Sequence, residues 1–174
     1  LLSANSIRVN LGTTTTRADE KNISQTVYEI SKIGGASDFV KNISVFEGSA
    51  GNDTFTVGAG NYTFIGGAGD DTLISVSGNN TLEGGTNNSG GDWVYYNQKL
   101  VALNLNMKNV DSSGYAIANF GSETDKLKEI ENIRGTIKAD FIGGNDQNNT
   151  LDAFMGDGNT LIGSGGDDVL LASS

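Results

Sequence analysis

Between residues 48 and 95 the sequence repeats with a period of nine. GGAGDDTLI at 66–74 follows GSAGNDTFT at 48–56 and VGAGNYTFI at 57–65, and it precedes SVSGNNTLE at 75–83. The unit from residue 84, GGTNNSGGDWVY, has three extra residues in its turn. Each unit carries a glycine-rich turn, an acid, amide or tyrosine at position six, and an apolar residue at position eight. A fixed short period of this kind predicts a stacked repeat architecture.

A second run of units covers residues 135–171. Its units are GTIKADFIG, GNDQNNTLD, AFMGDGNTLI with one extra residue, and GSGGDDVLL. Stretches of period-two alternation, IRVNLG at 7–12 and VALNLN at 101–106, lie upstream of the two runs and predict half-buried strands.

The chain therefore divides into two related parts. The first, 1–96, has linker strands followed by a repeat array at 48–95, and the second, 97–174, has linker strands followed by an array at 135–171. The sequence begins LLSANS, without an initiator Met or a basic segment, so we expect a fragment of a longer protein with no signal peptide.

A nine-residue unit, with a six-residue turn and a three-residue strand, makes half a coil. Successive strands then alternate between two parallel sheets, and successive turns alternate between two edges. The predicted fold is all-β: a parallel β-roll, which is a form of β-helix or solenoid, with β-strand linkers. Phe55, Leu73 and Val94 should line one sheet, and Phe64 and Leu82 the other.

The remaining apolar residues receive structural interpretations. In the second array the inward positions are Ile142, Leu151, Leu161 and Leu170. Met107 and Phe120 should belong to the core of the linker layer. The cluster Trp93, Tyr95 and Tyr96 should cap the end of the first roll, and KLKEIENIR at 126–134 should form a solvated turn or short helix.

Composition narrows the function classes. The chain has 11 Lys and Arg against 21 Asp and Glu, for a net charge of -10, which argues against a nucleic-acid partner. It has no Cys and no His, so thiolate nucleophiles and the commonest general base are missing, and we expect no enzyme activity. No apolar run approaches the roughly 20 residues that span a bilayer, so we expect no membrane insertion.

The repeat needs a cation to fold stably. Each unit buries one apolar side chain, worth about 1.5–3 kcal/mol, whereas ordering nine backbone residues costs roughly 9–18 kcal/mol. The stacked carboxylates also repel one another. A hard divalent cation bound by carbonyl and carboxylate oxygens offsets both effects, and ligation by oxygen alone favours Ca²⁺ over zinc, copper or Mg²⁺.

GSAGNDTFT, GGAGDDTLI and GSGGDDVLL resemble the G-G-x-G-x-D-x-U-x repeat of RTX (repeats-in-toxin) proteins, the hemolysin-type calcium-binding repeat. The resemblance implies calcium ions between turns on the same edge, held by turn carbonyls and the position-six acid. It assigns Ser49, Gly51 and Asp53 with Gly66, Ala68 and Asp71 to a first ion. It assigns Gly67, Gly69 and Asp71 with Gly84 and Asp92 to a second.

Position six predicts an asymmetric metal arrangement. It reads Asp53, Tyr62, Asp71, Asn80 and Asp92 through the first array. Because turns alternate edges, the three acids share one edge, and we expect calcium there and none on the edge of Tyr62 and Asn80.

Position six of the second array reads Asp140, Asn149, Asn159 and Asp168, so each edge pairs one acid with one amide. Asp140 and Asp168 are therefore candidate ligands of weaker sites, since the charge of the ligands sets calcium affinity. Asp70 and Asp167, at position five, should face solvent.

Two functions remain open at this stage. The first is a calcium-binding module that folds outside the cell and forms a structural part of a large bacterial secreted or surface protein, of the S-layer or adhesin type. The resemblance implies type I secretion, and neighbouring domains or copies would be partners. The alternative is an accessory module of a secreted toxin or polysaccharide-active enzyme, with Trp93, Tyr95 and Tyr96 binding carbohydrate.

Overall fold

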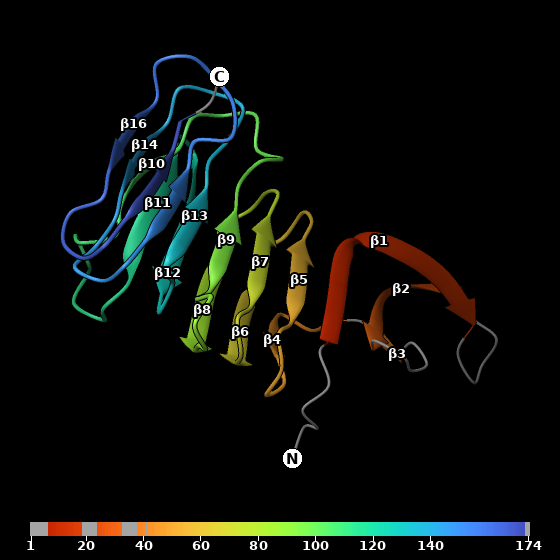
Figure 1. Ribbon diagram of the computed structural model, residues 1–174. Coiled ribbons are helices and arrows are strands. Elements are labelled where there is room, and N and C mark those ends of the chain that lie inside the picture. The colour runs from red at the N-terminus through yellow and green to blue at the C-terminus, as the bar shows by residue number, and fades with distance from the viewer. Residues whose placement is uncertain (1–6, 19–23, 33–37, 41, 173–174) are drawn as a thin grey trace.

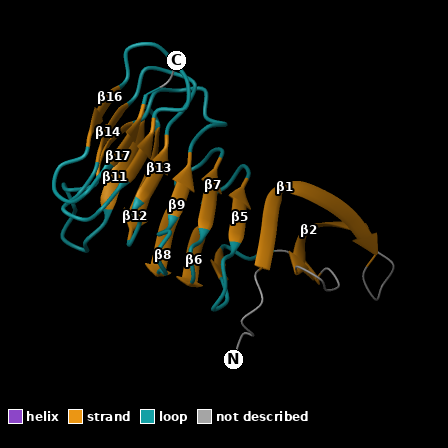
Figure 2. Ribbon diagram, viewed as in Figure 1, coloured by secondary structure: helices purple, strands orange, loops and turns teal. Residues whose placement is uncertain are grey.

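The computed structural model describes residues 7–18, 24–32, 38–40 and 42–172. These residues form strands and no helix (Figure 2). The strands are β1 (Ile7–Ala18), β2 (Ser24–Lys32), β3 (Asp38–Val40), β4 (Val45–Glu47), β5 (Thr54–Val57), β6 (Thr63–Ala68), β7 (Thr72–Ser75), β8 (Thr81–Thr86), β9 (Trp93–Tyr95), β10 (Asn104–Asn106), β11 (Ala116–Phe120), β12 (Glu123–Lys128), β13 (Asn132–Arg134), β14 (Phe141–Gly143), β15 (Thr150–Asp152), β16 (Thr160–Ile162) and β17 (Val169–Leu171). Within these ranges there is no helix long and apolar enough to cross a membrane.

The strands form two sheets that share the repeats between them. One sheet has nine strands in the order β17-β15-β13-β9-β7-β5-β1-β2-β3, and we call it the nine-stranded sheet. The other, the eight-stranded sheet, has the order β16-β14-β10-β11-β12-β8-β6-β4. Consecutive units of each array lie in opposite sheets, and every second unit pairs in parallel, as in β5–β7 and β6–β8 (Figure 1). The predicted all-β, parallel β-roll is confirmed.

The core is a ladder in which each repeat strand places one apolar side chain inward. In the nine-stranded sheet Phe55 pairs in register with Leu73, and Leu73 with Val94. In the eight-stranded sheet Phe46 pairs with Phe64, with ring centroids 5.2 Å apart, and Phe64 pairs with Leu82. The predicted division of these residues between two sheets is confirmed, because a period of nine places position eight inward in every strand.

The second array continues the same ladder. Ile142 and Leu151 are fully buried, and Leu161 is partly buried against the core. Leu170 lies in β17, the last strand of its sheet, and is 45% exposed. The inward residues are therefore as predicted, with weaker burial in the last described coil.

The linker between the arrays forms part of both sheets of the solenoid. β11 pairs antiparallel with both β12 and β10, and β10 and β11 lie between β12 and β14 in the eight-stranded sheet. In the nine-stranded sheet β13 is the direct neighbour of β15. Met107 and Phe120 are buried here, as predicted. Both sheets continue across residues 96 and 97, and the division into 1–96 and 97–174 stays a prediction.

The prediction of a solvated turn or short helix at 126–134 is wrong. Lys126–Lys128 pairs in parallel with Thr81–Glu83, and Asn132–Arg134 pairs in parallel with β9. The sequence TDKLK places an acid two residues before an apolar residue, as the repeats do, so Leu127 takes the inward position beside Leu82. β12 and β13 thus make one more coil without glycine-rich turns.

The predicted capping role of Trp93, Tyr95 and Tyr96 is also wrong. β9 pairs with β7 on one side and β13 on the other, so it is an interior strand. Tyr96 is fully buried and packs on Phe120, with ring centroids 4.7 Å apart. Trp93 and Tyr95 are half-buried at positions seven and nine, which point outward from the sheet.

The core ladder gives a matched pair of stability predictions. Leu82→Ala removes a fully buried side chain between Phe64 and Leu127, so it should lower the free energy of unfolding by about 2–5 kcal/mol. Leu170→Ala makes the same chemical change at the half-exposed last strand and should cost about 1 kcal/mol or less. Urea unfolding in saturating calcium measures both, and equal losses would contradict the ladder.

Candidate metal centre

The turns that lead from a strand of the eight-stranded sheet to the next strand of the nine-stranded sheet stack along one side of the solenoid, which we call the first edge. The turns that lead in the other direction stack along the opposite side, the second edge. Asp53, Asp71 and Asp92 stack there, as predicted. Asp71 Oδ1 accepts the backbone N–H of Asp53 at 2.7 Å, and Asp92 Oδ1 accepts that of Asp71 at 2.7 Å. Glu131 Oε2 accepts the N–H of Asp92 at 2.8 Å. Each acid therefore joins its own turn to the preceding one, and the row extends into the linker.

The other carboxylate oxygens of Asp71 and Asp92 have no partner. Asp71 Oδ2 and Asp92 Oδ2 are buried without a hydrogen bond, which among the described carboxylates sets these two apart. Burying an unpaired anionic oxygen is costly unless a cation compensates it. The donor set thus fits a bound cation.

Backbone carbonyls converge on the same two oxygens. A Cβ atom built on Gly66 would clash with Asp71 Oδ2 and would lie 2.5 Å from the carbonyl oxygen of Gly84. A Cβ atom on Gly84 would clash with Asp92 Oδ2 and with the carbonyl oxygen of Glu129. Each glycine therefore has a carboxylate oxygen and a carbonyl oxygen of the next turn beside its Cα, the kind of hard donors that calcium prefers.

Turn conformation separates these acids from Asp53. Gly67 and Gly85, at position two, have φ of 108° and 109°, a region that L side chains rarely adopt. In the turn of Asp53, position two is Ser49, whose backbone N–H donates to Asp53 Oδ2 at 2.5 Å and whose Oγ donates at 3.1 Å. In these turns Gly67 and Gly85 thus leave the acid without a bond from its own position two, whereas Ser49 closes the turn on Asp53.

The residues assigned to the first ion lie in stacked turns. The carbonyl of Ser49 accepts the N–H of Ala68 at 3.2 Å. A Cβ atom on Gly69 would lie 2.9 Å from the carbonyl oxygen of Gly51. Gly66 and Asp53 meet in the same way, since a Cβ on Gly48 would clash with the Gly66 carbonyl oxygen and Asp53 Oδ2.

The residues assigned to the second ion lie around the open acids. Gly84 and Asp71 meet beside Gly66. Gly67 stacks in register on Gly85, and the N–H of Gly69 donates to the Thr86 carbonyl at 2.9 Å. Ligation of calcium by either set stays a prediction.

Asp125, on the opposite or second edge, was missed by the sequence reasoning. Asn80 Oδ1 accepts the N–H of Tyr62 at 3.1 Å, and Asp125 Oδ1 accepts that of Asn80 at 2.8 Å. Asp125 Oδ2 accepts from Ser75 Oγ at 2.7 Å, and burial raises the pKa of Asp125. Asp125 therefore occupies position six of the coil β12–β13, which the spacing Asp125-x-Leu127 could have revealed.

The second array pairs acids with amides on both edges, as the sequence predicts. Asn159 Oδ1 accepts the N–H of Asp140 at 2.8 Å on the second edge. Asp168 Oδ1 accepts the N–H of Asn149 at 2.9 Å on the first. Both carboxylate oxygens of Asp140 already have partners. Oδ2 accepts the N–H of Thr136 in its own turn at 2.6 Å, and Oδ1 accepts the N–H of Leu103, which precedes β10, at 2.7 Å.

Asp70 has a structural contact beyond the solvent exposure expected for it. Its Oδ1 accepts the N–H groups of Asn88 at 2.8 Å and Gly91 at 3.1 Å. Asp70 thus holds the inserted turn at 84–92, while Asp71 Oδ2 is buried beside Gly66.

Side chains alone do not form a metal site in the described ranges, where no group of three or more Asp, Glu, His or Cys could hold an ion. Any ion on the first edge would therefore take backbone carbonyls as well as carboxylates.

Comparison with known proteins gives the class. The family model of the RTX calcium-binding nonapeptide repeat matches in four copies, over residues 47–82, 65–88 and 155–174. No curated protein matches the chain. Residues 47–88 and 155–174 therefore match RTX calcium-binding nonapeptide repeats, and the described residues fold as a β-solenoid.

Asp71 and Asp92, the acids whose Oδ2 atoms lack a hydrogen-bond partner, make the stability of the metal-free fold dependent on pH. Burial is the main cause that raises the pKa of Asp71 to about 6 and of Asp92 to about 7, from 3.8. Protons therefore bind the folded form more tightly than the unfolded chain, and this contribution to stability is lost as pH rises through 6 to 7. The metal-free protein should be more stable at pH 5 than at pH 8.

Calcium should reverse that dependence, since it competes with protons for the same oxygens. The β-sheet signal in circular dichroism, recorded for metal-free protein at the two pH values with and without added calcium, measures both effects, since the metal-free array is expected to unfold at neutral pH. The Asp71→Asn and Asp92→Asn double variant should show a smaller pH difference without metal. An unchanged difference would contradict the assignment to these carboxyls.

Proposed function

We propose that this chain is a calcium-dependent structural module of a large bacterial secreted or surface protein, of the S-layer or adhesin type, that folds outside the cell. The observation that carries the proposal is the pair of buried oxygens, Asp71 Oδ2 and Asp92 Oδ2, each beside a carbonyl of the next turn. Calcium ions are the ligand whose chemistry fits them.

Calcium dependence follows from what the fold buries without it. The first edge stacks three aspartates and a glutamate in adjacent coils, and their charges disfavour the stacked state. An ion that binds the folded form alone stabilises it by mass action. At the low free calcium of a cytosol the array would stay unfolded, and millimolar calcium outside would fill sites of modest affinity.

The continuity of the fold supports a scaffold role. Both sheets run from the first array through the linker to the second, so the chain forms one continuous solenoid (Figure 1). A continuous two-sheet solenoid resists bending better than modules on flexible linkers. Neighbouring domains or further copies of the parent protein would be its partners.

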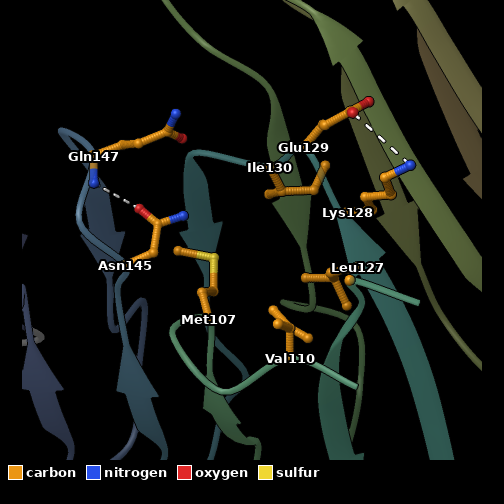
Figure 3. Close-up of a pocket in the computed structure, with 10 residues that line it drawn as sticks. Met107, Val110, Leu127, Lys128, Glu129, Ile130, Asn145 and Gln147 are labelled. Atoms are coloured by element: carbon orange, nitrogen blue, oxygen red, sulfur yellow. Dashed lines mark hydrogen bonds and ion pairs between the residues drawn. The ribbon is translucent and has the colours of Figure 1, made fainter. Parts of the chain in front are cut away.

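The pocket in Figure 3 is lined largely by apolar residues. It has a volume of about 280 Å³ and lies between the turn after β12 and the turn after β14. Met107, Leu127 and Ile130 line it with apolar surface. Lys128 and Glu129 at its rim pair with each other at 3.9 Å. Asn145 and Gln147 also line it.

A calcium titration followed by circular dichroism tests the proposal. The β-sheet signal should rise with calcium, and removing the ion should reverse it. A signal that is the same in metal-free buffer and in millimolar calcium would contradict calcium-driven folding.

Two alanine variants test which acids bind the ion. Asp71→Ala should raise the half-saturating calcium concentration at least tenfold, because Asp71 is shared by both assigned ions. Asp140→Ala should change it less, because backbone N–H groups and Thr136 Oγ1 already satisfy Asp140. Both variants lose a comparable buried acceptor, so an equal or larger effect for Asp140→Ala would contradict the assignment to the first edge.

Carbohydrate binding is the second candidate, and the outer face of the nine-stranded sheet favours it. Trp93 and Tyr95 meet edge-to-face there, with centroids 5.5 Å apart. The Arg134 guanidinium lies 4.6 Å from the Tyr95 ring centroid, and its Nε donates to Asp152 Oδ2 at 2.7 Å. Half-exposed rings beside a fixed ion pair can stack on a sugar and bond its hydroxyls.

Binding to a glycan array, in saturating calcium, distinguishes the two functions. An accessory carbohydrate-binding module should bind, and Trp93→Ala should abolish binding. Trp93→Phe, which retains an aromatic ring in the same place, should keep part of it. Absence of binding by the folded wild-type chain favours the scaffold.

A further inference from the structure

The first edge contains three successive interfaces between neighbouring turns, and they have the same geometry. In each, a position-one glycine has its own turn's acid and the next turn's carbonyl beside its Cα. At Gly48 the carbonyl belongs to Gly66, and at Gly66 it belongs to Gly84. At Gly84 it belongs to Glu129, which lies in the linker, outside the nonapeptide matches.

The third interface contains a buried carboxylate oxygen without a hydrogen-bond partner. Its acid is Asp92, whose Oδ2 is fully buried and lacks a hydrogen-bond partner. Asp71, the acid of the second interface, shares this property. A buried carboxylate oxygen without a partner needs compensation by a cation or a proton.

Glu131 stands in the third interface where Asp92 stands in the second. Asp92 Oδ1 accepts the N–H of Asp71, and Glu131 Oε2 accepts the N–H of Asp92 at 2.8 Å. Register agrees, since Asn132 pairs with Trp93 just as Trp93 pairs with Thr72. The two interfaces thus have the same arrangement of an open acid, a next-turn carbonyl and a next-turn acid.

The linker turn supplies its carbonyl from a residue other than glycine. Glu129 has a φ of 55°, and its carbonyl oxygen lies beside Gly84 as the Gly84 carbonyl oxygen lies beside Gly66. The three inserted residues of the turn at 84–92 do not push the turns apart, because Asn132 Nδ2 donates to the Gly90 carbonyl at 3.0 Å. The interface is therefore closely packed.

We propose a calcium site between the turn at 84–92 and the linker turn at 129–131, with Asp92 Oδ2 and the Glu129 carbonyl as ligands and Glu131 as the second acid. Backbone carbonyls of the turn at 84–92 and water supply the remaining oxygens that Ca²⁺ requires. The site rests on the proposed calcium-binding function and adds an ion that the nonapeptide pattern does not predict.

This site joins the first array to the linker. Its ligands come from the last turn of the array and from the turn that connects β12 to β13. Calcium bound there would hold the coil β12–β13 against β8 and β9, so the array and the linker would order together.

Calcium counting with two matched variants tests the third site. The 174-residue chain, wild-type, Glu131→Gln or Glu47→Gln, is equilibrated with calcium chloride, and bound calcium per chain is measured by equilibrium dialysis. Glu131→Gln retains an oxygen that can accept the Asp92 N–H but loses its charge, so it should bind one calcium ion fewer. Glu47→Gln should bind as many as wild type, since Glu47 is exposed and belongs to no assigned site.

Wild-type counts in Glu131→Gln would overturn the third site and leave the proposed function standing. No bound calcium in the wild-type chain would overturn both. If Glu131→Gln fails to fold, wild-type crystals grown in calcium chloride decide. Anomalous density between Asp92 and the Glu129 carbonyl is expected; density beside Asp71 alone would overturn the site.

Discussion

The fold depends on one hydrogen bond that recurs at position six, from the backbone N–H of one coil to the side-chain oxygen of the next. This N–H lies where the turn enters the strand, and it needs an acceptor when buried. Asp71, Asp92 and Glu131 accept it on the first edge, and Asn80 and Asp125 on the second. At these positions an amide oxygen and a carboxylate oxygen both accept the bond, so the fold itself does not distinguish an amide from an acid. A metal requires more, because only a carboxylate has a second, charged oxygen to offer.

In four turns, those that begin at residues 48, 66, 84 and 135, the residue at position two goes with what happens to that second oxygen. Where it is Ser49 or Thr136, a hydroxyl and a backbone N–H of the same turn bind the acid. Where it is Gly67 or Gly85, the backbone adopts positive φ and the acid keeps an oxygen without a partner. A one-residue difference thus separates a turn that satisfies its own acid from a turn that leaves the acid for a cation.

Much of this architecture follows from the period of nine. It predicts which residues face inward, which sheet each strand joins and which acids share an edge, because strand, turn and edge all repeat with the unit. The coil β12–β13 escaped prediction because its connecting turn has no glycine. Its position-six residues, Asp125 and Glu131, are visible only as acids two residues before Leu127 and Ile133. The capping role expected of Trp93 failed because later strands pair with β9, which a local pattern cannot show.

The place of β10 and β11 has a consequence for the order of assembly. The chain leaves β9 and enters the eight-stranded sheet at β10, which is separated from β8 by the two positions that β11 and β12 occupy. β11 and β12 then fill those positions in reverse, toward β8. Because β11 is antiparallel to both neighbours, two added strands restore the original direction, and β14 can pair in parallel with β10. A simple solenoid can wind one coil at a time from either end. In this chain β10, β11 and β12 form an antiparallel meander beside β8, and coiling continues only after the meander has formed.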